Sequence, residues 1–265
     1  MANTNNTVKV LSFSPSADAE LNRWVLFYYG ISFNEKRHTL PFYFILNKLQ
    51  GGNSLVLCRD GQTKLKSVRE VINHFDAQVT SDKKLIPDAH INEMEYSWHR
   101  YNSDLGQAAV EWAYTNLLPH KDIMIRPLTL GSPWIERQFV KYCYNIPKKM
   151  VWNSQQLSKP VADNALVLIK DIFYEVDQLL SDGRKYLYGD KLTLADLTFA
   201  VSGAPLVLPA NYGGDQFEQG PIPTFEEFPE ELQETISTMR QTDAGRYILR
   251  LYSEDRYRTI EHNHS

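Results

Sequence analysis

Cysteine is scarce in this chain of 265 residues, which holds only Cys58 and Cys143. The two lie far apart among apolar neighbours, a setting typical of buried thiols in a reducing compartment rather than of a disulfide framework. No Cys-x-x-Cys pair occurs, so a thioredoxin-like reductase is disfavoured. The seven histidines show no metal-ligand spacing, and we therefore predict no bound metal.

Long apolar runs and basic blocks are also missing. No apolar stretch approaches the roughly 18 residues of a membrane span, and the N-terminus does not resemble a secretory signal. The 28 Lys and Arg stand against 32 Asp and Glu, which gives a net charge of −4. We predict a cytoplasmic protein whose partners include neither a membrane nor a nucleic acid.

The opening eighty residues predict short alternating elements, in a chain long enough for two modest domains. A helix is predicted to begin at Ser14-Pro15 and to end at Gly30, since serine caps a helix and proline suits its first turn. The other predicted elements are, in order, a strand at 8–13, a strand at 31–38, an ambiguous segment at 39–53, strands at 54–59 and 63–66, and a helix opened by Ser67.

Helical periodicity dominates beyond a polar linker at 79–87. Apolar side chains recur every three or four residues from Ile91 to Trp112, which predicts one long helix. A Gly- and Pro-rich stretch at 209–228 predicts a surface loop, and 261–265 a polar tail. Further helices are predicted at 132–144, 160–180, 193–207, 229–240 and 243–255.

The helix at 193–207 carries the clearest local signal. Thr193 is followed three residues later by Asp196, so hydroxyl and carboxylate can each accept the other residue's amide in a capping box. The following residues are almost all apolar, which places this helix in the middle of a helical domain. Thr193 and Asp196 are therefore predicted to be a structural cap.

Three motifs in this order resemble the cytosolic glutathione transferase superfamily. They are residues 19–26 with Gly30-Ile31, the turn Asp60-Gly61 followed by Leu65-Lys66-Ser67, and Gly189 with the capping segment 192–196. The resemblance covers 8 to about 205, and the last two helices look like an extension of some bacterial members, so the chain resembles an atypical, bacterial-type member.

The resemblance implies an α/β plus all-α architecture, in which an N-terminal thioredoxin-like domain precedes a C-terminal helical bundle. Residues 1–80 would bind glutathione, and 88–265 would form an all-helical domain with a hydrophobic substrate pocket. The implied partners are glutathione, a hydrophobic small molecule and, in a homodimer, a second copy of the chain. Detoxification is the implied role.

The implied glutathione site begins at Ser67. A helix N-terminus offers amides and partial positive charge to an anion, and in this family it receives the γ-glutamyl carboxylate. Ser67 can also simply cap its own helix with Glu70. Lys66 departs from the acidic or amide residue usual before that serine, and can pair with the ligand carboxylate or remain solvated.

The family's cis-proline, which exposes backbone to the cysteinyl unit, is not matched. Its place falls on Ser54 or Leu55. A cis bond before another residue costs about 2.5 to 4 kcal/mol, so we expect a trans or rearranged backbone. This is the strongest sequence argument against ordinary glutathione binding.

A hydrogen bond to the glutathione thiolate is needed for activation, and is worth about 1.5 to 3 kcal/mol, or roughly one to two pKa units. The resemblance offers Ser16 as the preferred catalytic residue, Ser12 as the second candidate and Ser14 as a helix cap. Each also fits an ordinary turn or cap serine. The alignment to cysteine-type members places Asp18 there instead, and its carboxylate would oppose a thiolate.

The hydrophobic pocket is expected between the two domains, against the first long helix. Phe13, Trp98 and Tyr101 are its candidate walls, although aromatic residues at helical spacing also suit a core. Arg23 is expected to pair with an acid between domains. Two functions remain open: a glutathione transferase acting on a hydrophobic electrophile, and a catalytically silent relative that binds apolar ligands or a protein.

Overall fold

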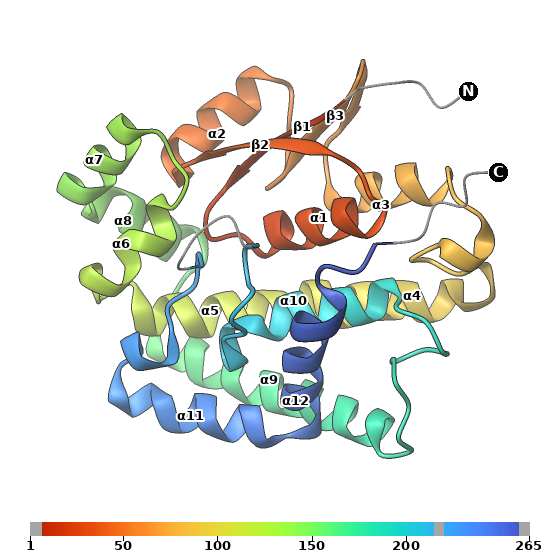
Figure 1. Ribbon diagram of the computed structural model, residues 1–265. Helices are drawn as coiled ribbons and strands as arrows, with labels where there is room; N and C mark the ends of the chain where they lie inside the picture. Colours follow the sequence, from red (N-terminus) through yellow and green to blue (C-terminus); the bar gives the residue numbers. More distant parts are fainter. Residues whose placement is uncertain (1–6, 215–219, 260–265) are drawn as a thin grey trace.

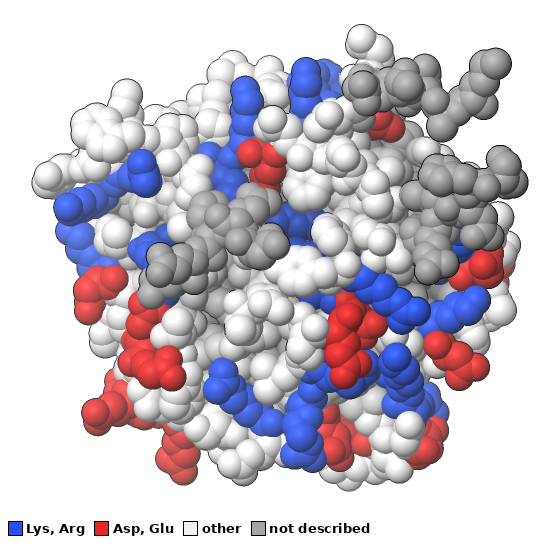
Figure 2. All heavy atoms as spheres, viewed as in Figure 1, with Lys and Arg blue, Asp and Glu red and all other residues white. Residues whose placement is uncertain are grey.

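A small sheet lies above layers of helices in the computed structural model (Figure 1). The structure describes residues 7–214 and 220–259. The predicted polar tail at 261–265 and the middle of the Gly- and Pro-rich stretch, 215–219, lie outside the described residues. No helix in the described part of the chain is long and apolar enough to cross a membrane. Acidic and basic side chains are interspersed on the face shown in Figure 2.

The sheet has four strands in the order β2-β1-β3-β4. β1 and β2 are parallel because a helix connects them, whereas β3 pairs antiparallel with β1 and β4. Gly61 takes φ +57 in the hairpin turn, a conformation that glycine adopts without steric cost. The strands are β1 Val8–Phe13, β2 Phe33–His38, β3 Leu57–Asp60 and β4 Thr63–Leu65.

Three helices accompany the sheet. α1 (Ala17–Tyr28) and α3 (Val68–Asp76) lie between the sheet and the helical half, and α2 (Leu40–Leu49) lies on the opposite side (Figure 1). α1 begins later than predicted, because Ser16 is its N-cap. The prediction that Ser14 caps this helix is therefore wrong.

The rest of the chain is helical, which confirms the expected mixed-sheet half followed by a helical half. The helices are α4 Ile91–Ser97, a π-helical stretch Trp98–Leu105, α5 Gly106–Leu117, α6 Lys121–Thr129, α7 Trp134–Tyr142, α8 Asn145–Ser154, α9 Lys159–Leu180, α10 Leu194–Val207, α11 Glu230–Gln241 and α12 Asp243–Arg250 with a π-helical end Leu251–Asp255. Sequence reasoning missed α6 and α8, which contain Pro127 and Pro147. Proline normally indicates a helix break.

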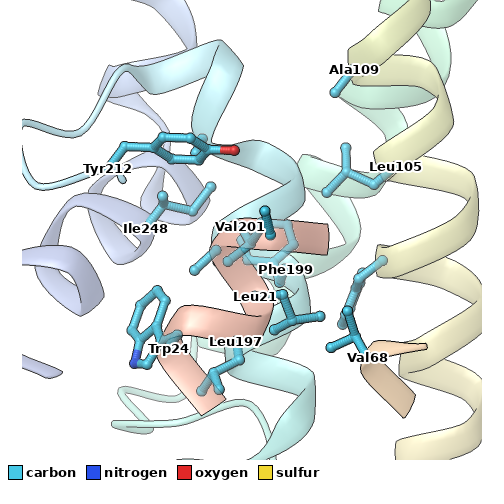
Figure 3. Close-up of a cluster of buried hydrophobic side chains, with 14 of the residues drawn as sticks. Leu21, Trp24, Val68, Leu105, Ala109, Leu197, Phe199, Val201, Tyr212 and Ile248 are labelled. Carbon is cyan, nitrogen blue, oxygen red and sulfur yellow. The ribbon is translucent and has the colours of Figure 1, made fainter. Parts of the chain in front are cut away.

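α10 runs through the core, where all of its 14 residues except Pro205 are buried. Figure 3 shows Leu197 and Val201 of this helix beside the side chains of α1. Thr193 and Asp196 form the predicted capping box, and the Asp196 carboxylate accepts the Thr193 amide at 2.6 Å. The structural role predicted for these two residues is confirmed.

The Gly- and Pro-rich stretch is only partly at the surface, which corrects the prediction for it. Tyr212 is 3% exposed and stacks on Tyr252, with ring centroids 6.0 Å apart. The Gly213 amide donates to the Glu20 carboxylate at 3.0 Å. This part of the stretch is buried, and its Gly213 amide provides a hydrogen bond to the buried Glu20 carboxylate of α1.

A buried ionic network joins the two halves. Glu20, whose side chain has no exposure, pairs with Arg23 at 3.0 Å and with Arg256 at 2.8 Å. Glu35 of β2 pairs with Arg23 at 2.9 Å and with Arg37 at 3.0 Å. The expectation for Arg23 is wrong in detail, since both of its acids belong to the sheet half. Glu20 makes the link to the helical half instead, through Arg256.

Glu35 should make stability depend on pH in the acid range. Burial alone would raise the pKa of its carboxyl, but Arg23 and Arg37 outweigh burial and lower that pKa from 4.5 to about 2. The contribution of Glu35 is therefore complete above pH 4.5 and is lost as pH falls towards 2. We expect urea unfolding at successive pH values to show this loss, and Glu35→Gln to flatten the profile over the same interval. An unchanged slope in the variant would contradict this assignment.

Candidate functional site

A cleft of about 510 Å³ is walled by both halves of the molecule. Its floor is the β1–α1 connection and the first turn of α1. The sheet half adds Phe44 of α2 and Leu55, and the helical half adds Val110 and Tyr114 of α5 and Met150 of α8. Most of the lining side chains are apolar, and polar groups stand both at the floor and on the helical walls, so the cleft suits a largely apolar ligand with a few polar groups.

Ser16 is the predicted serine that the structure places in this cleft. Its Oγ accepts the Ala19 amide at 3.2 Å, as an N-cap does. No acceptor for its hydroxyl proton is found within 7–214 and 220–259. The hydroxyl is thus held in place by the helix while its proton can be donated to a ligand.

Ser12 and Ser14 lie elsewhere. Ser12 is fully buried in β1 and its hydroxyl donates to the Glu35 carboxylate. Ser14 is 1% exposed, and its Oγ has no hydrogen-bond partner among the described residues. Neither lines the cleft, so the structure brings only Ser16 of the three candidates to it.

The segment expected to present backbone to glutathione is already engaged. The Ser54 carbonyl accepts the Tyr43 hydroxyl and the Asn47 amide group, both at 2.8 Å. The one cis peptide bond within the described residues is Ser14–Pro15, so Ser54 and Leu55 stand in trans bonds, as expected. Leu55 lines the cleft and is 39% exposed.

Ser67 starts α3 just beside this segment. Its Oγ accepts the Glu70 amide at 3.2 Å, and the Glu70 carboxylate accepts the Lys66 amide at 2.7 Å. The Ser54 hydroxyl donates to the Lys66 carbonyl, which connects the residue before Leu55 to the helix start. Ser54, Lys66 and Ser67 do not line the cleft itself. The start of α3 therefore lies next to the cleft edge, and the Glu70 carboxylate already accepts one of the backbone amides there.

Asp18 is an unpaired carboxylate at the cleft floor. It lies in the first turn of α1, and burial raises the pKa of its carboxyl from 3.8 to about 6. No ion pair or hydrogen bond of this side chain is found within the described ranges, and none of the described lining residues is Lys or Arg. Because the folded state favours the neutral form, ionisation of Asp18 lowers the free energy of unfolding as pH rises through about 6.

The predicted aromatic walls are only partly correct. Phe13 lines the cleft, but Tyr101 is 1% exposed and packs on Phe199 with ring centroids 5.2 Å apart. The Arg69 guanidinium lies over the Trp98 ring at 5.4 Å, also outside the cleft. The expectation for Tyr101 and Trp98 is wrong, because the face of the long helix that carries them packs on the protein.

The neighbouring face of the long helix supplies the actual wall. Asn102, Gly106, Val110 and Tyr114 recur every four residues, and all line the cleft. Such a spacing places residues on one helix face, so this second stripe was a readable signal that sequence reasoning passed over.

A smaller apolar cavity of about 80 Å³ adjoins the cleft. The two share Pro15, Ala17, Val110 and Tyr114 as walls. The Tyr114 hydroxyl donates to the Pro15 carbonyl at 3.3 Å, which fixes the ring between them. The cavity extends the apolar part of the site towards the Gly- and Pro-rich stretch.

Comparison with known proteins agrees with this architecture. Residues 134–203 match the family model for the glutathione S-transferase C-terminal domain. The glutathione S-transferase CsGST83044 of Ceriporiopsis subvermispora, solved in complex with glutathione, is 11% identical, with a TM-score of 0.57 over 93% of this chain and 98% of that one. Glutathione transferase GSTFuA2 of Phanerochaete chrysosporium is 11% identical, with a TM-score of 0.59 over 94% and 98% of the two chains.

At these identities the structural likeness shows a shared fold, and no curated protein sequence matches the chain significantly. The fold, a thioredoxin-like half followed by a helical half, and the family match within the helical half agree. The chain has the fold of the glutathione transferases, and its residues 134–203 match the C-terminal domain of that family.

Proposed function

We propose that the protein uses glutathione as a co-substrate and reacts its thiolate with a hydrophobic electrophile in the cleft. The observation that carries this proposal is the Ser16 hydroxyl, which lies at the cleft floor with its oxygen held by the Ala19 amide. Family resemblance further leads us to propose a cytoplasmic homodimer that acts in detoxification.

Ser16 would stabilise the thiolate by donating its hydroxyl proton in a hydrogen bond. Thiols have an ordinary pKa of about 8.5, and a hydrogen bond to a charged group is worth about 1.5 to 3 kcal/mol. One such bond lowers the thiol pKa by roughly one to two units. The bound thiol would then be substantially ionised near neutral pH, when it is nucleophilic.

The rest of glutathione would extend from Ser16 past Leu55 towards the start of α3. Leu55 stands at the cleft edge, and hydrogen bonding links its neighbour Ser54 to Lys66, directly before Ser67. The α3 N-terminus offers amides to the γ-glutamyl carboxylate. Lys66 would supply a cation beside the Glu70 carboxylate. The hydrophobic electrophile would occupy the apolar wall of Phe13, Val110 and Tyr114.

Ser16→Ala tests the proposed activator directly. We expect the pKa of bound glutathione, followed by thiolate absorbance, to rise by roughly one to two units, and turnover of a chlorinated nitroaromatic at neutral pH to fall about 10- to 100-fold. Ser14→Ala is the matched control, since this buried hydroxyl lies outside the cleft. An unchanged thiol pKa in Ser16→Ala would remove Ser16 as the activator.

A catalytically silent ligand-binding protein is the second candidate. It is favoured by the Ser54 carbonyl, which already accepts two hydrogen bonds, and by the trans backbone at Leu55. Retention on immobilised glutathione separates the cases. Retention without turnover of the chlorinated nitroaromatic indicates the silent protein. Absence of both retention and turnover indicates that glutathione is not its ligand.

A further inference from the structure

The charge of the cleft indicates a ligand that the proposed function leaves open. Asp18 is a carboxylate without a partner among the described residues, in a cleft where none of the described lining residues is Lys or Arg. We propose that the cleft binds a small organic ammonium cation with an aromatic or alkyl body, which pairs with the Asp18 carboxylate. Binding of the cation requires no glutathione, because it depends only on the charge and the lining of the cleft.

A cation would compensate an unfavourable arrangement. Asp18 is half-buried and has no partner among the described residues, which disfavours its ionised form, and an opposite charge within a few ångströms favours that form. Lys and Arg could supply that charge from the protein, but neither type lines the cleft. The missing positive charge would therefore come from the ligand.

The aromatic walls suit the same ligand. Phe13, Phe44 and Tyr114 all line the cleft, and the faces of aromatic rings attract ammonium groups. A carboxylate beside aromatic rings provides one strong ionic contact and an apolar surface for the rest of the molecule. The cleft volume of about 510 Å³ also falls within the usual range for small-molecule sites.

The other titratable groups near Asp18 provide no counter-charge. Tyr43 of α2 and Tyr212, after α10, interact electrostatically with Asp18, and burial raises the pKa of both phenols, so they stay neutral. Tyr114 of α5 is also neutral, because burial raises its pKa to about 12. α8 contributes Met150 and the uncharged residues Val151, Ser154 and Gln155. On α1 itself, Glu20 and Arg23 already form ion pairs within the buried network.

A bound cation would also bear on the thiolate. An ionised Asp18 near Ser16 raises the energy of a second negative charge, as like charges do in one site. A cation paired with Asp18 removes that repulsion. A cationic electrophile would therefore support formation of the thiolate that attacks it.

The predicted pH dependence follows from the ionisation of Asp18. With a carboxyl pKa of about 6, roughly a tenth of the molecules are ionised one unit below that value, and nearly all are ionised two units above it. An alkylammonium stays charged over this interval. Its affinity should therefore rise about tenfold from the lower to the higher pH.

Calorimetric titration of the whole protein without glutathione tests the proposal, with phenethylammonium and its neutral analogue phenethyl alcohol as probes. We expect the ammonium to bind about tenfold more tightly two units above pH 6 than one unit below it, and the alcohol to bind equally at both. Asp18→Asn should abolish the pH dependence for the ammonium and leave the alcohol unaffected.

Glu111→Gln is the matched control, since Glu111 is a half-buried acid of α5 outside the cleft lining. It should leave the affinity of the ammonium unchanged. Two results would overturn the proposal. One is equal affinity of the ammonium and the alcohol two units above pH 6, and the other is an Asp18→Asn variant that keeps the pH dependence. The titration contains no glutathione, so its outcome does not affect the Ser16→Ala test. Failure of the Ser16→Ala test likewise does not affect the titration.

Discussion

Glu20→Gln is expected to lower the free energy of unfolding by about 3 to 5 kcal/mol, the usual effect of removing one partner from a buried ion pair. Glu20 is fully buried and accepts from Arg23 at 3.0 Å, from Arg256 at 2.8 Å and from the Gly213 amide at 3.0 Å. The neutral amide keeps the shape of the side chain but leaves two buried guanidinium groups with less negative charge nearby. Urea unfolding at neutral pH measures the loss.

Glu111→Gln serves as the control for Glu20→Gln as well, because its carboxylate accepts only a side-chain amide of Gln107 within the described residues. We expect a change of at most about 0.5 kcal/mol there. If Glu20→Gln also changed stability by less than about 1 kcal/mol, the network would not hold the two halves together as argued.

Asp196→Ala should be the other strongly destabilising change, by about 3 to 5 kcal/mol. The Asp196 carboxylate accepts the Leu187 amide at 2.8 Å, the Thr193 amide at 2.6 Å and the Tyr247 hydroxyl at 2.5 Å. Each buried donor left without a partner costs about 1 to 3 kcal/mol. Alanine removes the acceptor for all three.

Thr193→Ala makes the comparison informative, because it removes only the cap hydroxyl and should cost about 0.5 to 2 kcal/mol. Thermal and urea unfolding of the two variants would measure the difference. Similar losses in both would mean that Asp196 acts only as a capping residue, and that its bonds to Leu187 and Tyr247 contribute little.

Sequence reasoning succeeded where a structure depends on close neighbours along the chain. β1 was predicted at its observed bounds, and Ser67 was correctly placed as the N-cap of α3. It failed where burial overrides local preference. α6 and α8 form despite their prolines, and Tyr101 is buried although its aromatic ring also suited a pocket wall.

The sequence by itself determined the four strands of the first half, the helix that begins at Ser67, and the cap at Thr193 and Asp196, since these depend on spacings of a few residues. Only the tertiary structure decided that Ser16 faces the cleft while Ser12 donates to Glu35. It also decided that Asp18 lacks a partner. Burial and pairing depend on side chains brought from distant parts of the chain, and spacing along the sequence carries no record of those contacts.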